Sequence, residues 1–244
     1  MIINAPIGFS YIFKGMALLP QKGIRVFVLI PLLINVLIFS LAVWFSSHQI
    51  DAWIEYFLPS WLTWLEWLLW PILAVIFFLI IFYTFTIIAN LIAAPFNALL
   101  AERIENKLKG LPMAKFEGYK SIPSLLARTF RSEAQKLLYM AKWFIALLIF
   151  SFIPVLNLVA PFAWLIFGAW MLAIEYVDYP MGNHGFYFKD ELKLLKNNKG
   201  LALGFGAGVA LLTSIPIVNF FAMPIGVAGS TALWVQHFSK NTQV

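Results

Sequence analysis

The sequence predicts an all-α integral membrane protein with two long transmembrane helices, two pairs of re-entrant half-membrane helices and an amphipathic cytoplasmic helical region. Its 244 residues are 62% hydrophobic and 11% charged, a composition outside the range of soluble globular proteins. The apolar runs are too long, and alternate too little, for a β-barrel. Proline and asparagine interrupt two of the runs, so we expect each of these to form two helices.

The two long helices are predicted over residues 24–45 and 71–101. The first run has the length of one helix that crosses a bilayer, about 33 Å. The second is longer, and Pro95 is expected to kink it near its end. Residues 1–23 predict a short helix on the membrane surface. We expect residues 1–244 to form a single membrane domain.

The segment 46–70 between the two long helices is rich in tryptophan and carries acidic but no basic residues. Tryptophan is typical of membrane interfaces, so we expect an aromatic belt there, although a cage for a cationic ligand would use the same side chains. Basic residues flank the other end of each long helix. The positive-inside rule therefore places segment 46–70 outside, and the N-terminus and residues 102–142 in the cytoplasm.

Residues 102–142 form the one long polar region, with nine Lys and Arg against four Glu. From Ser124 onward we expect an amphipathic helix, with Phe130 and Leu137 on its apolar face. This helix is expected to lead directly into the next apolar run. The later polar stretch 178–200 and the end of the chain also lean basic, which places the C-terminus in the cytoplasm.

The two broken helix pairs are predicted over residues 143–177 and 201–238. Both contain the pattern Ile-Pro-x-x-Asn, which ends at Asn157 in the first pair and 62 positions later at Asn219 in the second. Paired apolar segments that are broken by proline point to the substrate path of a transporter. A tight loop in an ordinary helical hairpin explains the same residues, and length alone leaves open whether the arms cross half or all of the membrane.

Gly23, Ile24 and Arg25 open the first long helix, and their residue types fit an anion site. A helix start offers free backbone N–H groups and the positive end of the helix dipole. Glycine lets an anion approach the backbone, and the forked guanidinium of arginine suits phosphate or sulfate. An arginine at the cytoplasmic end of a membrane span is also an ordinary anchor.

Two polar groups flank the apolar runs and are candidates for a pore or gate. The first follows the second long helix, where charged side chains either gate ion entry or mark the interface. The second ends the first broken pair, where it caps the helix, lines the path or, in a membrane-embedded hydrolase, carries out catalysis. The first group is Glu102, Arg103 and Glu105, the second is Glu175, Asp178 and His184, and Asn157 and Asn219 complete the candidates.

No cofactor, metal or nucleic-acid partner is expected. The sequence has no cysteine, and its three histidines lack the spacing of metal ligands. It has no nucleotide-binding loop and no catalytic Ser/His/Asp order, so an enzyme is not expected. The net charge of +6 reflects orientation in the membrane more than a nucleic-acid partner.

Short stretches at the starts and ends of the apolar runs carry a family resemblance. They read Gly23-Ile24-Arg25-Val26-Phe27, Ile30-Pro31-Leu32-Leu33-Ile34-Asn35, Ile92-Ala93-Ala94-Pro95-Phe96-Asn97, Leu99-Leu100-Ala101-Glu102, Ala169-Trp170-Met171-Leu172-Ala173-Ile174, Asp178-Tyr179-Pro180, Asn183-His184, Ile215-Pro216-Ile217-Val218-Asn219 and Met223-Pro224. In these stretches and in their spacing, over essentially its whole length, the chain resembles the CysZ sulfate permeases of bacterial inner membranes.

The resemblance implies sulfate uptake for assimilation into cysteine, without an ATPase subunit. It implies two long helices with two half-membrane pairs, and homo-oligomers, dimers or larger, in contact with membrane lipid. It places a sulfate contact on Gly23, Ile24 and Arg25. The chain departs from the family at Val26, where a second arginine is frequent, and at Gly182, where an acidic residue is common. Backbone N–H groups are therefore expected to carry more of the sulfate contact.

Overall fold

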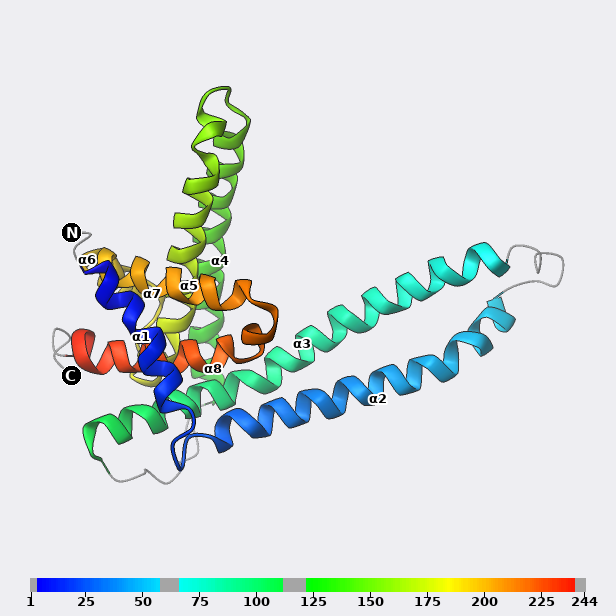
Figure 1. The fold of residues 1–244 in the computed structure, drawn as a ribbon, viewed down its shortest axis with the longest axis horizontal. Helices are drawn as coiled ribbons and strands as arrows, with labels where there is room; N and C mark the ends of the chain where they lie inside the picture. The colour runs from blue at the N-terminus through cyan, green and yellow to red at the C-terminus, as the bar shows by residue number, and fades with distance from the viewer. Residues whose placement is uncertain (1–3, 58–65, 112–121, 240–244) are drawn as a thin grey trace. The chain divides into compact units, whose positions relative to one another are not determined.

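The computed structural model describes residues 4–57, 66–111 and 122–239, and every regular element within these ranges is helical (Figure 1). The predicted all-α class is therefore confirmed. Parts of the tryptophan-rich segment 46–70 and of the polar region 102–142 lie outside the described residues.

Contacts divide the chain into two units, of which one, Val26–Phe96, is a long helical hairpin. It consists of α2 (Val26–Phe57) and the first part of α3 (Glu66–Lys109) (Figure 1). Apolar side chains on both helices are exposed, among them Leu33 at 63% and Phe78 at 61%, as contact with lipid tails requires. That residues 1–244 form a single membrane domain stays a prediction.

The other unit comprises Met1–Arg25 and Asn97–Val244, so it includes the end of α3. Its described residues form six further α-helices, a short 3-10 segment between α4 and α5, and a π-helical turn, η3, after α8. The α-helices are α1 (Ala5–Leu18), α4 (Ile122–Phe152), α5 (Ala160–Asn183), α6 (Phe188–Asn197), α7 (Lys199–Ser214) and α8 (Pro216–Leu233), the 3-10 segment is Leu156–Leu158, and η3 is Trp234–Phe238.

α1, α5, α7 and α8 pack into the core of this unit, and glycines on α7 let the helices approach closely. A Cβ atom at Gly204 would collide with the carbonyl oxygen of Ala5 on α1. A Cβ atom at Gly206 would collide with the carbonyl oxygen of Ala169 on α5. Small residues at such crossings are typical of helix packing in membranes, where lipid tails are as apolar as the side chains.

α1 belongs to this core, because it packs on both α7 and α8. Its Tyr11 and Ile12 are 1% and 3% exposed. The Tyr11 hydroxyl donates to Oε1 of Gln236 at 2.8 Å, and Lys14 Nζ donates to the same oxygen at 2.9 Å. A short helix within residues 1–23 is therefore present, and its contacts with α7 and α8 hold it in the core of the unit.

The first broken run is interrupted after Phe152, where α4 ends. The chain turns through the 3-10 segment Leu156–Leu158 before α5 begins. Val155 has a φ of +71°, a left-handed conformation that β-branched residues rarely adopt. The Asn157 backbone N–H donates to the Ile153 carbonyl at 3.1 Å and closes the turn.

The second broken run is interrupted more sharply, at Ile215. α7 ends at Ser214, Ile215 is extended with φ −102° and ψ 111°, and Pro216 is the first residue of α8. Proline is tolerated at a first helical position, because an N–H there has no partner within the helix. The Asn219 backbone N–H donates to the Ile215 carbonyl at 2.8 Å. The predicted interruption of both runs is therefore confirmed.

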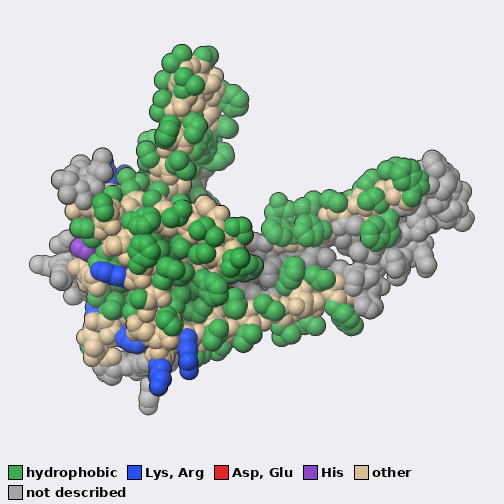
Figure 2. Space-filling model, in the orientation of Figure 1, with side chains coloured by type: hydrophobic (Ala, Val, Ile, Leu, Met, Phe, Trp, Pro, Cys, Tyr) green, Lys and Arg blue, Asp and Glu red, His purple; other side chains and the backbone are tan. Residues whose placement is uncertain are grey.

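Helices long and apolar enough to cross a membrane occur four times in the described part of the chain. Figure 2 shows apolar side chains covering α4 and α5 out to their tip, where Phe152 and Val155 are 80% and 75% exposed. The chain is therefore a helical membrane protein. The four stretches of this length are Val26–Phe45, Arg131–Phe152, Ala160–Asn183 and Pro216–Phe238, whereas Lys199–Ser214 is apolar but shorter.

Replacing Gly204 by alanine is expected to destabilise the unit by about 1–3 kcal/mol, because the new methyl group must displace the α1 backbone at Ala5. Gly168→Ala on α5 is the matched control, since no atom lies within 4 Å of a Cβ there. That change is expected to stabilise α5 by about 0.5–1 kcal/mol. Thermal unfolding of the purified variants in detergent measures both effects, and equal melting temperatures would contradict the proposed close packing.

Candidate functional site

The segment Gly23–Arg25 forms a turn just before α2. Gly23 has a φ of +87°, a conformation that glycine adopts without strain. The backbone N–H groups of Ile24 and Arg25 donate to the carbonyl of Gln21 at 3.1 and 3.3 Å. The Ile24 side chain is only 1% exposed, whereas Gly23 and Arg25 are exposed. The turn is therefore anchored by the isoleucine and closed by its own backbone.

This geometry divides the three residues by role. Because the Ile24 and Arg25 N–H groups are already bonded within the turn, they are not free to bind an anion in this conformation. The Gly23 N–H has no hydrogen-bond partner among the described residues. The exposed donors of the segment are thus the Gly23 backbone and the Arg25 guanidinium, which differs from the expectation that the whole segment presents free N–H groups.

The first polar group contributes Glu105 to a buried hydrogen-bonded pair between α3 and the end of α5. Glu105 is 5% exposed, and Nε2 of His184 lies 2.8 and 2.9 Å from its two carboxylate oxygens. Lys109 Nζ lies 2.7 Å from Oε1 of the same carboxylate. The His184 ring also packs on Trp234, with the ring centroids 5.5 Å apart. Glu105 and His184 were candidates on sequence grounds, and the fold brings them together.

The contacts of Glu105 decide its charge. Burial acts to raise the pKa of Glu105, but the hydrogen bonds and charges of His184 and Lys109 outweigh burial and hold that pKa below its usual range. The carboxylate is therefore ionised at neutral pH. The stability that this pair contributes is present above the ordinary glutamate pKa and is lost as the pH falls through the lowered value.

Glu102 and Arg103 lie on the same helix as Glu105, and both are half-buried. Neighbouring contacts tie this part of α3 to α5. The Asn183 side chain donates to the Ala98 carbonyl at 2.9 Å, next to the Glu105–His184 pair. The end of α3 is thus held against the end of α5 by several polar contacts.

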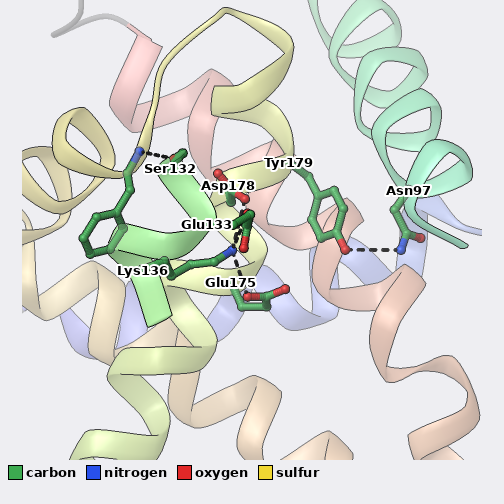
Figure 3. Close-up of polar contacts among 8 residues, drawn as sticks. Asn97, Ser132, Glu133, Lys136, Glu175, Asp178 and Tyr179 are labelled. Carbon is green, nitrogen blue, oxygen red and sulfur yellow. Dashed lines mark hydrogen bonds and ion pairs between the residues drawn. The ribbon is translucent and has the colours of Figure 1, made fainter. Parts of the chain in front are cut away.

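A second charged cluster joins α4 to α5 around Lys136, which is 5% exposed (Figure 3). Its Nζ lies 3.1 Å from Glu133, 3.2 Å from Glu175 and 3.3 Å from Asp178. Three carboxylates thus surround the ammonium group, and it donates a hydrogen bond to Asp178. Close by, the Asn97 side chain donates to the Tyr179 hydroxyl at 3.5 Å. We name Lys136, Glu133, Glu175 and Asp178 the Lys136 cluster.

The second polar group, Glu175, Asp178 and His184, is therefore split by the fold. Glu175 and Asp178 pair with Lys136, whereas His184 pairs with Glu105. A hydrolase that combines Glu175, Asp178 and His184 has no support in this geometry. Within the described ranges, no group of three or more His, Asp or Glu side chains is placed to hold a metal ion.

Asn157 and Asn219 lie at the two helix breaks, and both are exposed. Their backbone N–H groups close the turns, as described above. Their side chains make no hydrogen bond within the part of the chain that the structure describes. The amide groups at the tips are thus available to water or to a passing polar solute.

Sequence reasoning missed three residues of this region, namely Lys136, Trp234 and Glu191. Lys136 was counted only as one basic residue of the polar region 102–142. A signal was present, because Glu133 and Lys136 on one side of the first apolar run, and Glu175 and Asp178 on the other, are each spaced three residues apart. A lysine on one side of a hairpin turn and acidic residues at a similar distance on the other side predict an ion pair at its base.

Comparison with known proteins gives matches along nearly the whole chain. A family profile described as Sulfate transporter CysZ/Etoposide-induced protein 2.4 matches residues 11–224. The chain is 39% identical over 232 residues to the sulfate transporter CysZ of Pseudomonas syringae pv. tomato, which covers 94% of this chain and 92% of that protein. It is 43% identical over 246 residues to the sulfate transporter CysZ of Vibrio cholerae serotype O1, with coverage of 98% and 96%.

Lys136→Met is expected to destabilise the α4–α5 hairpin by about 2–3 kcal/mol, because Asp178 and its neighbours lose their shared counter-charge. The loss falls below that of a fully buried pair, since Glu133 and Glu175 are nearly half exposed and regain water. Lys193→Met, at an exposed position of α6, is the control and is expected to have almost no effect. Thermal unfolding in detergent measures the difference. Equal stability of the two variants would show that the Lys136 cluster contributes nothing to the fold.

Proposed function

The chain belongs to the Sulfate transporter CysZ/Etoposide-induced protein 2.4 family, and from that premise we propose that it carries sulfate across the bacterial inner membrane. The observation that carries the proposal is the near full-length match to relatives named sulfate transporter CysZ. The helices of membrane-spanning length agree with it. Sulfate brought in by this route would supply assimilation into cysteine, without an ATPase subunit or a chemical step.

The proposed sulfate contact lies on Gly23, Ile24 and Arg25. The exposed guanidinium of Arg25 and the free N–H of Gly23 are the donors, and charge-assisted hydrogen bonds of this kind are the strong ones for an oxyanion. The buried side chain of Ile24 holds the two donors in place. Val26 stands at the position where a second arginine would add another guanidinium group, so Arg25 supplies the positive charge of this segment's sulfate contact alone.

The proposed path runs between helix pairs that enter the membrane and turn back. α7 has 16 residues, or about 24 Å of helix, which is short of the roughly 30 Å hydrocarbon core. About 24 Å of helix likewise separates Lys136 from the tip at Phe152. A hairpin whose charged base lies at the interface would then end inside the membrane. The loss of hydration is costly for a dianion, so the path must be wet and lined by polar groups.

Eight residues are proposed for the pore or gate. The Glu105–His184 pair and the Lys136 cluster are closed polar contacts at the base of the first helix pair, where their opening would admit an ion. Asn157 and Asn219 present free amides at the tips. The full set is Glu102, Arg103, Glu105, Asn157, Glu175, Asp178, His184 and Asn219.

The membrane setting follows from charge and exposed apolar surface. The N- and C-termini are proposed to face the cytoplasm, because the polar segments near them lean basic. The exposed apolar side chains of α2 to α5 contact lipid or a second copy of the chain. We therefore include a homo-oligomer, a dimer or larger, in the proposal.

Purified protein in liposomes that contain no other protein is expected to let labelled sulfate enter down its gradient. Arg25→Ala is expected to weaken sulfate binding by tenfold or more, since a hydrogen bond to a charged group contributes about 1.5–3 kcal/mol. Lys22→Ala, at an exposed lysine of the same segment, is the control and is expected to bind sulfate as the parent does. Calorimetry measures binding, and tracer uptake measures flux.

Two outcomes separate the claims. Flux by the parent together with unchanged binding in Arg25→Ala would remove the proposed site and leave the function. No flux by the parent would instead favour a regulatory subunit that acts on another transporter.

A further inference from the structure

α6 carries a glutamate on the face that it buries. Phe188, Glu191 and Leu195 are 5%, 1% and 0% exposed, whereas Lys189 and Lys193 face solvent. Neither carboxylate oxygen of Glu191 has a hydrogen-bond partner within the described residues. Buried carboxylates are otherwise paired or hydrogen-bonded, so a side chain in this position needs a specific explanation.

The charged groups around Glu191 do not supply a counter-ion. From α4 it is faced by Lys136 and Glu133, and from α5 by Asp178 and Glu175. The lysine Nζ already lies 3.1 to 3.3 Å from the other three carboxylates of the Lys136 cluster, and it donates a hydrogen bond to Asp178. One cation thus lies among four carboxyl groups.

The remaining elements near α6 do not change this balance. α7 also packs on α6, and its one titratable residue, Lys199, is exposed. The link from α5 supplies His184, which is bonded to Glu105, and Tyr187. In the described ranges no set of acidic and histidine side chains is arranged for a metal ion. A proton is the ligand that the geometry leaves for Glu191.

We propose that Glu191 is a proton-binding site, and that α6 stays docked on α4 and α5 while this carboxyl is neutral and loosens when the proton leaves. Burial, followed by the negative charge of Asp178, raises the pKa of Glu191 well above its usual range, which agrees with a neutral carboxyl at neutral pH. The Phe188 N–H donates to the Ser132 hydroxyl at 2.9 Å and marks the edge of the docked contact.

The protonation state of Glu191 would therefore control how firmly α6, the helix that joins the two broken pairs, is docked. α6 is the only helix between α5 and α7, so its docking fixes the base of the first pair against the start of the second. An ionised Glu191 would add a fourth negative charge beside a single lysine and would repel Asp178. The inference does not require sulfate, so its test is independent of the transport proposal.

The sign of the pH dependence follows from the raised pKa. Above the ordinary glutamate pKa of about 4.3 the unfolded chain has lost this proton while the folded chain keeps it. Stability from this site therefore falls as the pH rises, by up to about tenfold in the unfolding constant per pH unit, until the folded pKa is reached. Glu191→Gln mimics the neutral carboxyl and is expected to remove this slope.

The test compares the parent with Glu191→Gln and with the control Glu133→Gln, whose half-exposed carboxylate belongs to the same cluster. Infrared spectra at neutral pH are expected to show a protonated carboxyl band that disappears in Glu191→Gln and persists in Glu133→Gln. Hydrogen exchange of α6 amides, corrected for intrinsic rates, is expected to be tenfold or more faster at pH 9 than at pH 6 in the parent, and unchanged in Glu191→Gln.

Two outcomes would overturn the inference. One is a carboxyl band that Glu191→Gln leaves in place, because Glu191 would then be ionised. The other is failure of both Glu191→Gln and Glu191→Met to fold, since a site that is neutral in the folded protein tolerates a neutral side chain.

Discussion

The interruption of two apolar runs is the constraint on which the rest of the structure depends. In hydrocarbon, an unbroken helix is the easiest way to satisfy the backbone, and a break must be closed by groups at hand. Here the backbone N–H of Asn157 and that of Asn219 each bond to the carbonyl four residues before. The two breaks differ in detail, because the first uses a left-handed Val155 and the second only an extended Ile215. Both convert a run that is too long for one span into two shorter arms.

Charged and apolar side chains lie at opposite ends of the first broken pair. The tips of the arms are apolar and exposed, whereas the charges gather at the bases, in the Lys136 cluster and the Glu105–His184 pair. Elsewhere in this unit, glycines such as Gly204 let the backbone of α7 lie directly against the backbone of α1, because they have no side chain to separate the two helices. At the base of the first pair, these contacts fix α4 to α5 and the end of α3 to the end of α5.

Much of the fold could be predicted from the sequence, because apolar length and proline position act locally. The long apolar runs, the continuous helix leading into the first broken pair and both breaks follow from such local signals. The place of α1 could not be predicted, since its fit depends on glycines of α7 and α8 that lie far along the chain. The sequence of residues 1–23 predicted a helix on the membrane surface, whereas α1 lies in the core of its unit with Tyr11 at 1% exposure. The sequence of such a short helix does not distinguish the two positions.

The sequence predicted most residues of the candidate site, but it did not predict which of their side chains contact one another. Glu105 and His184 were both candidates, but their partnership needs the end of α3 to meet the end of α5. Glu175 and Asp178 were grouped with His184 because they are neighbours in sequence, whereas Lys136, about forty residues away, is their partner in the fold. Glu191 gave no signal at all, because a glutamate among lysines on a short helix normally faces water.

The most direct measurement asks on which side of the membrane the breaks lie. The chain has no cysteine, so single cysteines at Asn157 and Asn219 can be labelled cleanly. Lys193→Cys marks the side of the helix bases, and Ser60→Cys marks the side that the charge pattern predicts to be outside. A thiol reagent that cannot cross the membrane, added to intact cells, is expected to label only the cysteine at position 60. Labelling at positions 157 and 219 from outside, with position 193 protected, would mean that the arms cross the whole bilayer and would contradict the account.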